Sequence, residues 1–214
     1  MTSFTRHARL IDSLVEGLGP VRRLPHPGLR ALGWVAFVVL SGLLLARSSD
    51  LAGLRDRIAA TPEIGIAMLG SAITAALAAW AALQSTVPGH GRQWGLLPLP
   101  GLLLWAGASG LGCLGQTTSG SLSFRTAMGE CLPFVVLVSL PISAVLILML
   151  RRGYATRPGQ VGVLAGLAAA AAAATLLNLF HPFDVAAMDL LAHALAVVLV
   201  CCAGWACGRG LSCR

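Results

Sequence analysis

The chain has 214 residues, of which 57% are hydrophobic and 11% are charged, and its mean hydropathy is +0.81. A soluble domain carries about 25% charged residues, so this chain lacks the polar side chains that an ordinary water-facing surface needs. An integral membrane protein is the class that fits. The net charge of +7 comes from arginines that lie between apolar stretches. This distribution favours retention at a membrane over direct binding of nucleic acid.

Six apolar stretches approach the roughly 20 residues that a helix needs to cross a hydrocarbon core. They cover residues 29–46, 64–83, 95–114, 132–150, 161–180 and 185–207. They predict an all-α membrane protein, a six-transmembrane-helix bundle over 29–207, with a short cytoplasmic N-terminal arm at 1–28 and a tail at 208–214. We expect Pro98 and Pro100 to shorten or kink the third helix, and Pro133 to stand in the first turn of the fourth, with Pro141 bending its interior.

The fifth stretch is built from small residues. An alanine run covers residues 168–174, and Gly162 and Gly166 stand four residues apart on the same stretch. This spacing lets two helices approach closely, and we interpret it as packing within the bundle rather than as a dimer contact.

The arginines predict the orientation of the bundle. With the N-terminus inside, eleven arginines fall on inner segments: Arg6, Arg9, Arg22, Arg23, Arg30, Arg92, Arg151, Arg152, Arg157, Arg209 and Arg214. Four fall on outer segments: Arg47, Arg55, Arg57 and Arg125. Since arginine accumulates on the cytoplasmic side, we expect a multi-pass protein of the bacterial inner membrane with both termini in the cytoplasm.

The arm contains a short amphipathic pattern that ends at Gly19-Pro20. Its apolar helix face consists of Leu10, Ile11, Leu14, Val15 and Leu18. Asp12 and Glu16 face away, and an acidic back favours a protein groove over anionic lipid. The extended segment that follows consists of Val21, Arg22, Arg23, Leu24 and Pro25. Whether Arg22 and Arg23 contact a partner or only determine topology is left open by the sequence.

Reactive side chains gather on the expected outer face. They are Cys113, Cys131, His181, Asp184, Asp189 and His193. Thiolate, imidazole and carboxylate groups bind soft or borderline metals, although the spacing matches no standard zinc motif. Two thiols in an oxidising compartment could form a disulfide instead. The alternatives are apolar packing for the cysteines and hydrogen bonding between helices for Asp189 and His193.

The sequence contains no HExxH, GxSxG or P-loop motif. We therefore expect neither enzymatic activity nor a cofactor. The first five expected helices carry no ionisable residue near their middles, where transporters often have one. A small-molecule permease or a polytopic membrane enzyme with its site at Asp189 and His193 is the alternative function.

Several motifs resemble a known family in their order along the chain. They are Val21-Arg22-Arg23-Leu24-Pro25, Val87-Pro88-Gly89 with Trp94, Cys131 before Ser139-Leu140-Pro141, Arg151-Arg152-Gly153, His181-Pro182 with Asp184, and Gly208-Arg209. Together they resemble the NrsF-like negative regulators of sigma factor, which are six-helix inner-membrane proteins. The resemblance implies an anti-sigma factor that sequesters an extracytoplasmic-function sigma factor and releases it under stress, with heavy metal or oxidant as the cue.

The resemblance also implies a sensing role for Cys131, which matches a family cysteine near the outer face. A second family cysteine often stands in a His-Cys-Pro context after the fifth helix. This chain has Phe180-His181-Pro182 there, without a cysteine. Cys113 and His181 are the candidates to replace it.

Overall fold

The computed structural model describes residues 2–16, 24–89, 91–115, 124–153, 155–179 and 187–211, and within these ranges it contains helices and no strand. The helices are α1 (Thr2–Glu16), α2 (Pro27–Ala46), α3 (Leu51–Ala60), α4 (Pro62–Gln84), the 3-10 helix η1 (Arg92–Leu96), α5 (Leu99–Gly115), α6 (Phe124–Leu150), α7 (Pro158–Leu177) and α8 (Ala187–Leu211). Six helical segments, in α2, α4, η1 with α5, α6, α7 and α8, are long and apolar enough to cross a membrane. The predicted all-helical fold with six long apolar helices is confirmed.

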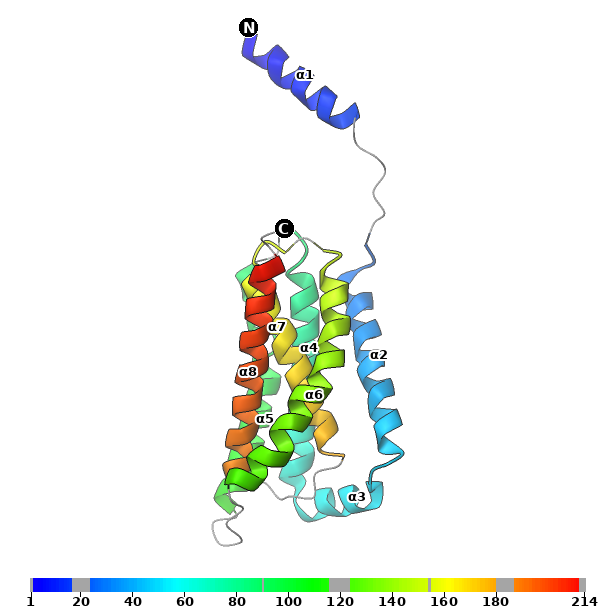
Figure 1. The fold of residues 1–214 in the computed structure, drawn as a ribbon, viewed down its shortest axis with the longest axis vertical. Helices are drawn as coiled ribbons and strands as arrows, with labels where there is room; N and C mark the ends of the chain where they lie inside the picture. The colour runs from blue at the N-terminus through cyan, green and yellow to red at the C-terminus, as the bar shows by residue number, and fades with distance from the viewer. Residues whose placement is uncertain are drawn as a thin grey trace.

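α7 lies in the middle of the bundle and contacts α4, α6 and α8, while α2 packs on the outside against α4 and α6 (Figure 1). α2 begins and α8 ends at the same end of the bundle, which we name the arm end (Figure 1). The short helix α3 lies across the opposite end, the α3 end (Figure 1). α1 stands apart from the bundle, beyond the arm end (Figure 1).

The connection between α2 and α4 contains α3, which the apolar pattern did not predict. Asp50 starts this helix, because its Oδ1 atom accepts a hydrogen bond from the backbone N–H of Gly53 at 2.9 Å. Leu54 buries its side chain beneath the helix. Ten residues that include Arg55 and Arg57 are too short and too polar to be recognised as a membrane span.

Two expectations about proline have different outcomes. Pro98 lies in the turn between η1 and α5, so α5 begins at Leu99, later than the predicted start at residue 95. The prolines therefore shorten this helix, as expected. The expectation for Pro133 is wrong, because α6 begins at Phe124 and includes both Pro133 and Pro141 in its interior.

α7 and α8 meet through glycines on both helices. A Cβ atom on Gly162 would overlap the carbonyl oxygen of Gly204, and one on Gly208 would overlap that of Pro158. A Cβ on Gly166 would lie 2.7 Å from the carbonyl oxygen of Val200. Apolar helices gain no hydrophobic energy from one another in lipid, so in a membrane such close van der Waals contact would be what holds them together. The predicted packing within the bundle is confirmed.

The α7–α8 contact gives a direct test of its own. Gly162→Leu should lower the free energy of unfolding by about 2–3 kcal/mol, because the added side chain has to push two backbones apart. Thermal unfolding of the purified protein in detergent measures the effect. The matched control is Gly107→Leu on α5, where nothing lies within 4 Å of the position a Cβ would take. Equal melting temperatures for the two variants would contradict the assignment.

Candidate functional site

α1 presents an uncovered apolar stripe. Its members are Leu10 (57% exposed), Ile11 (59%), Leu14 (63%) and Val15 (57%). These four residues share one face, as the periodicity predicts. Side chains of this size are normally buried in a partner or in lipid, so the stripe is the first candidate site.

The polar face of α1 differs from the sequence interpretation. The helix begins at Thr2, well before the predicted start, so Arg9 stands three residues before Asp12 and seven before Glu16. All three side chains therefore share one face. This face therefore carries both positive and negative charge. The sequence interpretation started the helix at residue 10 and so counted only the two acidic residues.

Part of the predicted arm site lies outside the described residues, namely Leu18, Val21, Arg22 and Arg23. Leu24 and Pro25 are described. They form neither helix nor strand, and the Leu24 side chain is 46% exposed. His26 then starts α2, because its Nδ1 atom accepts a hydrogen bond from the backbone N–H of Gly28 at 3.1 Å. The arm thus joins a helix whose first turn is held by a side-chain cap.

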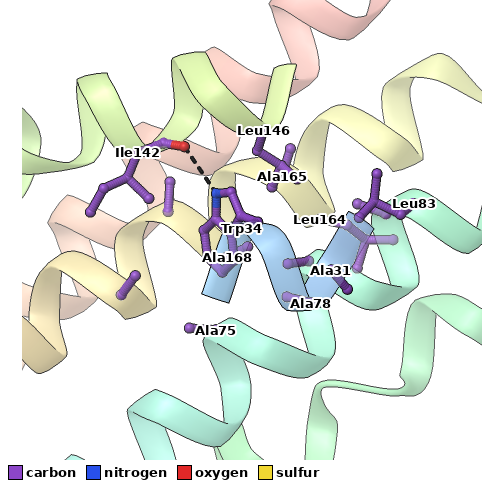
Figure 2. Close-up of a cluster of buried hydrophobic side chains, with 14 of the residues drawn as sticks. Ala31, Trp34, Ala75, Ala78, Leu83, Ile142, Leu146, Leu164, Ala165 and Ala168 are labelled. Carbon is purple, nitrogen blue, oxygen red and sulfur yellow. Dashed lines mark hydrogen bonds between the residues drawn. The ribbon is translucent and has the colours of Figure 1, made fainter. Parts of the chain in front are cut away.

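The helix that carries the arm is attached to α6 by two hydrogen bonds. The guanidinium of Arg30 donates to the carbonyl oxygen of Met149. The indole Nε1–H of Trp34 donates to the carbonyl oxygen of Ile142 at 3.1 Å, and the Trp34 ring is 0% exposed. Figure 2 shows this ring inserted among small side chains of α4 and α7. Trp34 and Ala31 are the two side chains that α2 buries.

Two of the motifs that resemble a family have structural roles in the loops of the arm end. Gly89 has φ +89°, a left-handed conformation that favours glycine. A Cβ on Gly153 would lie 2.7 Å from the Thr86 side chain, so this loop needs glycine to approach the end of α4. The ring of Trp94 lies 6.0 Å from that of Trp80. Gly89 therefore determines the turn after α4, while Gly153 and Trp94 hold their loops against α4.

The arm end of the bundle is basic. Its described residues, 24–30, 84–89, 91–95, 151–153, 155–158 and 208–211, include arginines and neither aspartate nor glutamate. Arg151, Arg152 and Arg157 lie in or beside the α6–α7 connection and are exposed. Arg209 places its guanidinium 4.8 Å from the centre of the Trp205 ring. The region nearest to the arm therefore attracts anionic groups.

The predicted sensing residues are only partly described. Cys113 lies near the end of α5 and Cys131 in α6, and their side chains are outside the described set. His181 and Asp184 are outside the described residues altogether. In the part of the chain whose side chains are described, no three His, Cys, Asp or Glu residues come close enough to hold a metal ion.

His193 lies on α8 beside a small and mostly apolar cavity. The cavity has a volume of about 20 Å³ and is also lined by Ser71 and Thr74 of α4 and Trp105 of α5. The Ser71 hydroxyl is 2.8 Å from that of Thr175 on α7. Asp189 lies one turn before His193 on α8, and its side chain is not among those described. The sequence indicated His193, whereas the hydroxyls of α4 come to it only through the tertiary fold.

Comparison with known proteins identifies a family rather than an individual relative. No curated protein and no solved structure matches the chain. The model of the NrsF family, described as negative regulator of sigma F, matches residues 14–212. The match covers nearly the whole chain and confirms the resemblance that the motifs indicated. It begins at Leu14, so Leu10 and Ile11 precede the matched region. The chain belongs to the NrsF family of negative regulators of sigma F.

Proposed function

We propose that this protein is a membrane-bound anti-sigma factor that sequesters an extracytoplasmic-function sigma factor and releases it under stress. The observation that carries the proposal is the uncovered apolar stripe of α1 in a chain that belongs to a family of sigma-factor regulators. The six long apolar helices support anchoring in the bacterial inner membrane. The basic arm end supports a cytoplasmic position for that end, and for both termini with it.

In this proposal, the stripe of α1 docks into a groove of the sigma factor. Each aliphatic side chain that leaves water on docking contributes about 1.5–3 kcal/mol. The opposite face of α1 carries mixed charge, which suits a helix whose polar face is exposed to water. A helix that lies on anionic lipid carries Lys and Arg on its polar face instead. The segment from Leu18 to Pro25 extends the contact toward α2, and Arg22 and Arg23 pair there with acidic side chains of the partner.

α6 provides a connection between the two ends of the bundle. Cys131 stands toward its α3 end, and Met149, which accepts a hydrogen bond from Arg30 of α2, stands 18 residues later. At 1.5 Å per residue these positions are about 27 Å apart along the helix. We propose that a change at Cys131 moves α6 and, through Arg30 and Trp34, the base of the arm. Release requires two bundle states that differ in affinity for the partner.

For the stress cue we propose a heavy metal or an oxidant acting at Cys131 near the outer face, with Cys113 and His181 as accompanying groups and Asp184 and His193 as further metal-ligand candidates. Thiolate and imidazole are the ligands that soft metals prefer, and a thiol is the first target of an oxidant. The cavity beside His193 has a volume of about 20 Å³, which is room for one water molecule and too small for a substrate. This size supports a regulator over a permease or an enzyme with its site at His193. We propose no catalytic activity.

The α1 interface is tested by placing the same charge on opposite faces. Leu14→Asp should weaken binding of the sigma factor about ten- to hundredfold, because an apolar anchor of about 1.5–3 kcal/mol is lost. Ser13→Asp adds the same charge on the polar face and should leave binding unchanged. Retention of the sigma factor in the membrane fraction, and its co-purification in detergent, measure both. Full retention after deletion of residues 10–25, with membrane insertion intact, would refute the arm as the binding site.

The thiol is tested at Cys131. Cys131→Ser should reduce the release of the sigma factor by metals or oxidants several-fold while leaving sequestration in unstressed cells intact, since serine has the same shape without the thiolate. A reporter driven by the sigma factor measures release. Cys202→Ser is the control, because Cys202 is an exposed free cysteine on α8. A normal response in the Cys131 variant would remove the thiol from the mechanism.

The connection between α6 and α2 is tested at Trp34. Trp34→Phe keeps an aromatic ring and removes the hydrogen bond to Ile142, which should destabilise the contact by about 1 kcal/mol. We expect induced release to fall, with the sigma factor still held in unstressed cells. Trp80→Phe is the control, because this tryptophan is 37% exposed and belongs to α4. Equal induction in both variants would contradict transmission through this contact.

A further inference from the structure

A large groove lies between α6 and α8, with α7 as its floor. Its volume is about 1150 Å³. Small residues of α7, among them Gly162 and Ala165, make the floor, so the two neighbouring helices stand apart over a low surface. Drug-sized ligands occupy pockets of about 300–1,000 Å³, so this groove has room for a larger molecule.

The walls of the groove are apolar, because the serine hydroxyls among them are already hydrogen-bonded within α6. Ser139 and Ser143 on α6 line it, and their hydroxyls donate to carbonyl oxygens of their own helix, those of Val136 at 2.8 Å and Leu140 at 2.9 Å. On α8 the wall runs from Leu199 to Gly208. The donors of these serines are used within α6, so a hydrocarbon can lie against them without leaving a polar group unsatisfied.

The groove is closed at one end and open at the other. Toward the α3 end, Val135 of α6 and Ala196 of α8 belong to one buried cluster, with exposed fractions of 1% and 0%. Toward the arm end, α6 and α8 diverge with α7 visible between them (Figure 1). The wall rises about 14 Å on α8, from Leu199 to Gly208, and about 21 Å on α6, from Val136 to Leu150, so the groove is deeper than the roughly 15 Å of one leaflet on one side but shorter than the roughly 30 Å of the full hydrocarbon core. This depth suits an acyl chain, whereas a membrane-spanning helix of a partner would need an open groove through the full thickness.

The open end of the groove is positively charged. Arg151 lines it, and Arg152 and Arg157 flank the same α6–α7 connection. All three side chains are exposed, and the described residues of the arm end include no acid. A charged group of a ligand that binds at this open end, beside Arg151, therefore has to be an anion.

We propose that the groove binds an anionic phospholipid of the cytoplasmic leaflet, with its acyl chains between α6 and α8 and its phosphate beside Arg151. The combination of an apolar cleft that does not cross the full hydrocarbon core and a basic open end matches the two parts of such a lipid. Arg152 and Arg157 add to the potential that selects anionic over zwitterionic headgroups.

Native mass spectrometry of the full chain in detergent, without a sigma factor, tests the site independently of the proposed function. The probes are phosphatidylglycerol and cardiolipin, compared with zwitterionic phosphatidylcholine. We expect the anionic lipids to bind at least about fivefold more tightly, and Arg151→Gln to reduce that preference about fivefold. Ala203→Phe places bulk in the groove at an exposed position of α8 and should reduce the binding of all three lipids.

Two matched variants serve as controls. Arg47→Gln removes an exposed arginine at the α3 end, and Leu103→Phe enlarges a side chain of α5 that is 70% exposed. Both should bind lipid as the unmodified protein does. Equal binding of anionic and zwitterionic lipid, or an unchanged preference in Arg151→Gln, would overturn the proposal. A dimer that survives removal of lipid and is lost in Ala203→Phe would also overturn it, since a second copy would then cover the groove.

Discussion

The small side chains of α7 are the constraint on which the arrangement of the other helices depends. A helix surrounded by several neighbours in lipid gains stability from van der Waals contact, and this contact is greatest where the backbones come close. α7 meets this requirement because every residue of its alanine run at 168–174 is buried, and Gly162 and Gly166 face α8 without side chains. A leucine-rich α7 of the same hydropathy would hold its neighbours further away.

α2 is held in a different way from the other helices. It inserts one large ring, Trp34, into the small-residue surface of α4 and α7 and anchors it to Ile142 of α6 (Figure 2). Val35, Phe37, Val38 and Leu45 are partly buried against the same cluster, whereas the outer face of α2 is exposed, with Leu32 at 65% and Leu43 at 62%. The arm is therefore carried by a peripheral helix whose position is specified by a few defined contacts. Because Trp34 is part of the buried cluster of α4, α6 and α7, a displacement of α2 would be coupled to the packing of those helices.

Much of the fold follows from local sequence, because an apolar stretch of about 20 residues has few alternatives to a helix. The stripe of α1 was equally predictable, since its spacing depends on helical periodicity alone. α3 was missed because its stability comes from the Asp50 cap and from Leu54 beneath it. The hydrogen bond from Trp34 joins residues 108 positions apart, so no local pattern indicates it. The groove between α6 and α8 was unpredictable for the same reason, since it arises from where two helices separate.

α6 joins the features that local sequence leaves unconnected. Its last turn holds the carbonyl of Met149 that binds Arg30 of α2, and Arg151 at the mouth of the groove stands two residues later. Cys131 lies on the same helix toward the α3 end. A displacement of α6 would therefore act on the base of the arm and on the proposed lipid site together. Because α6 is a single helix of 27 residues, the two proposals together imply that lipid in the groove and release of the sigma factor would be coupled: a bound lipid would favour one position of α6 over the other.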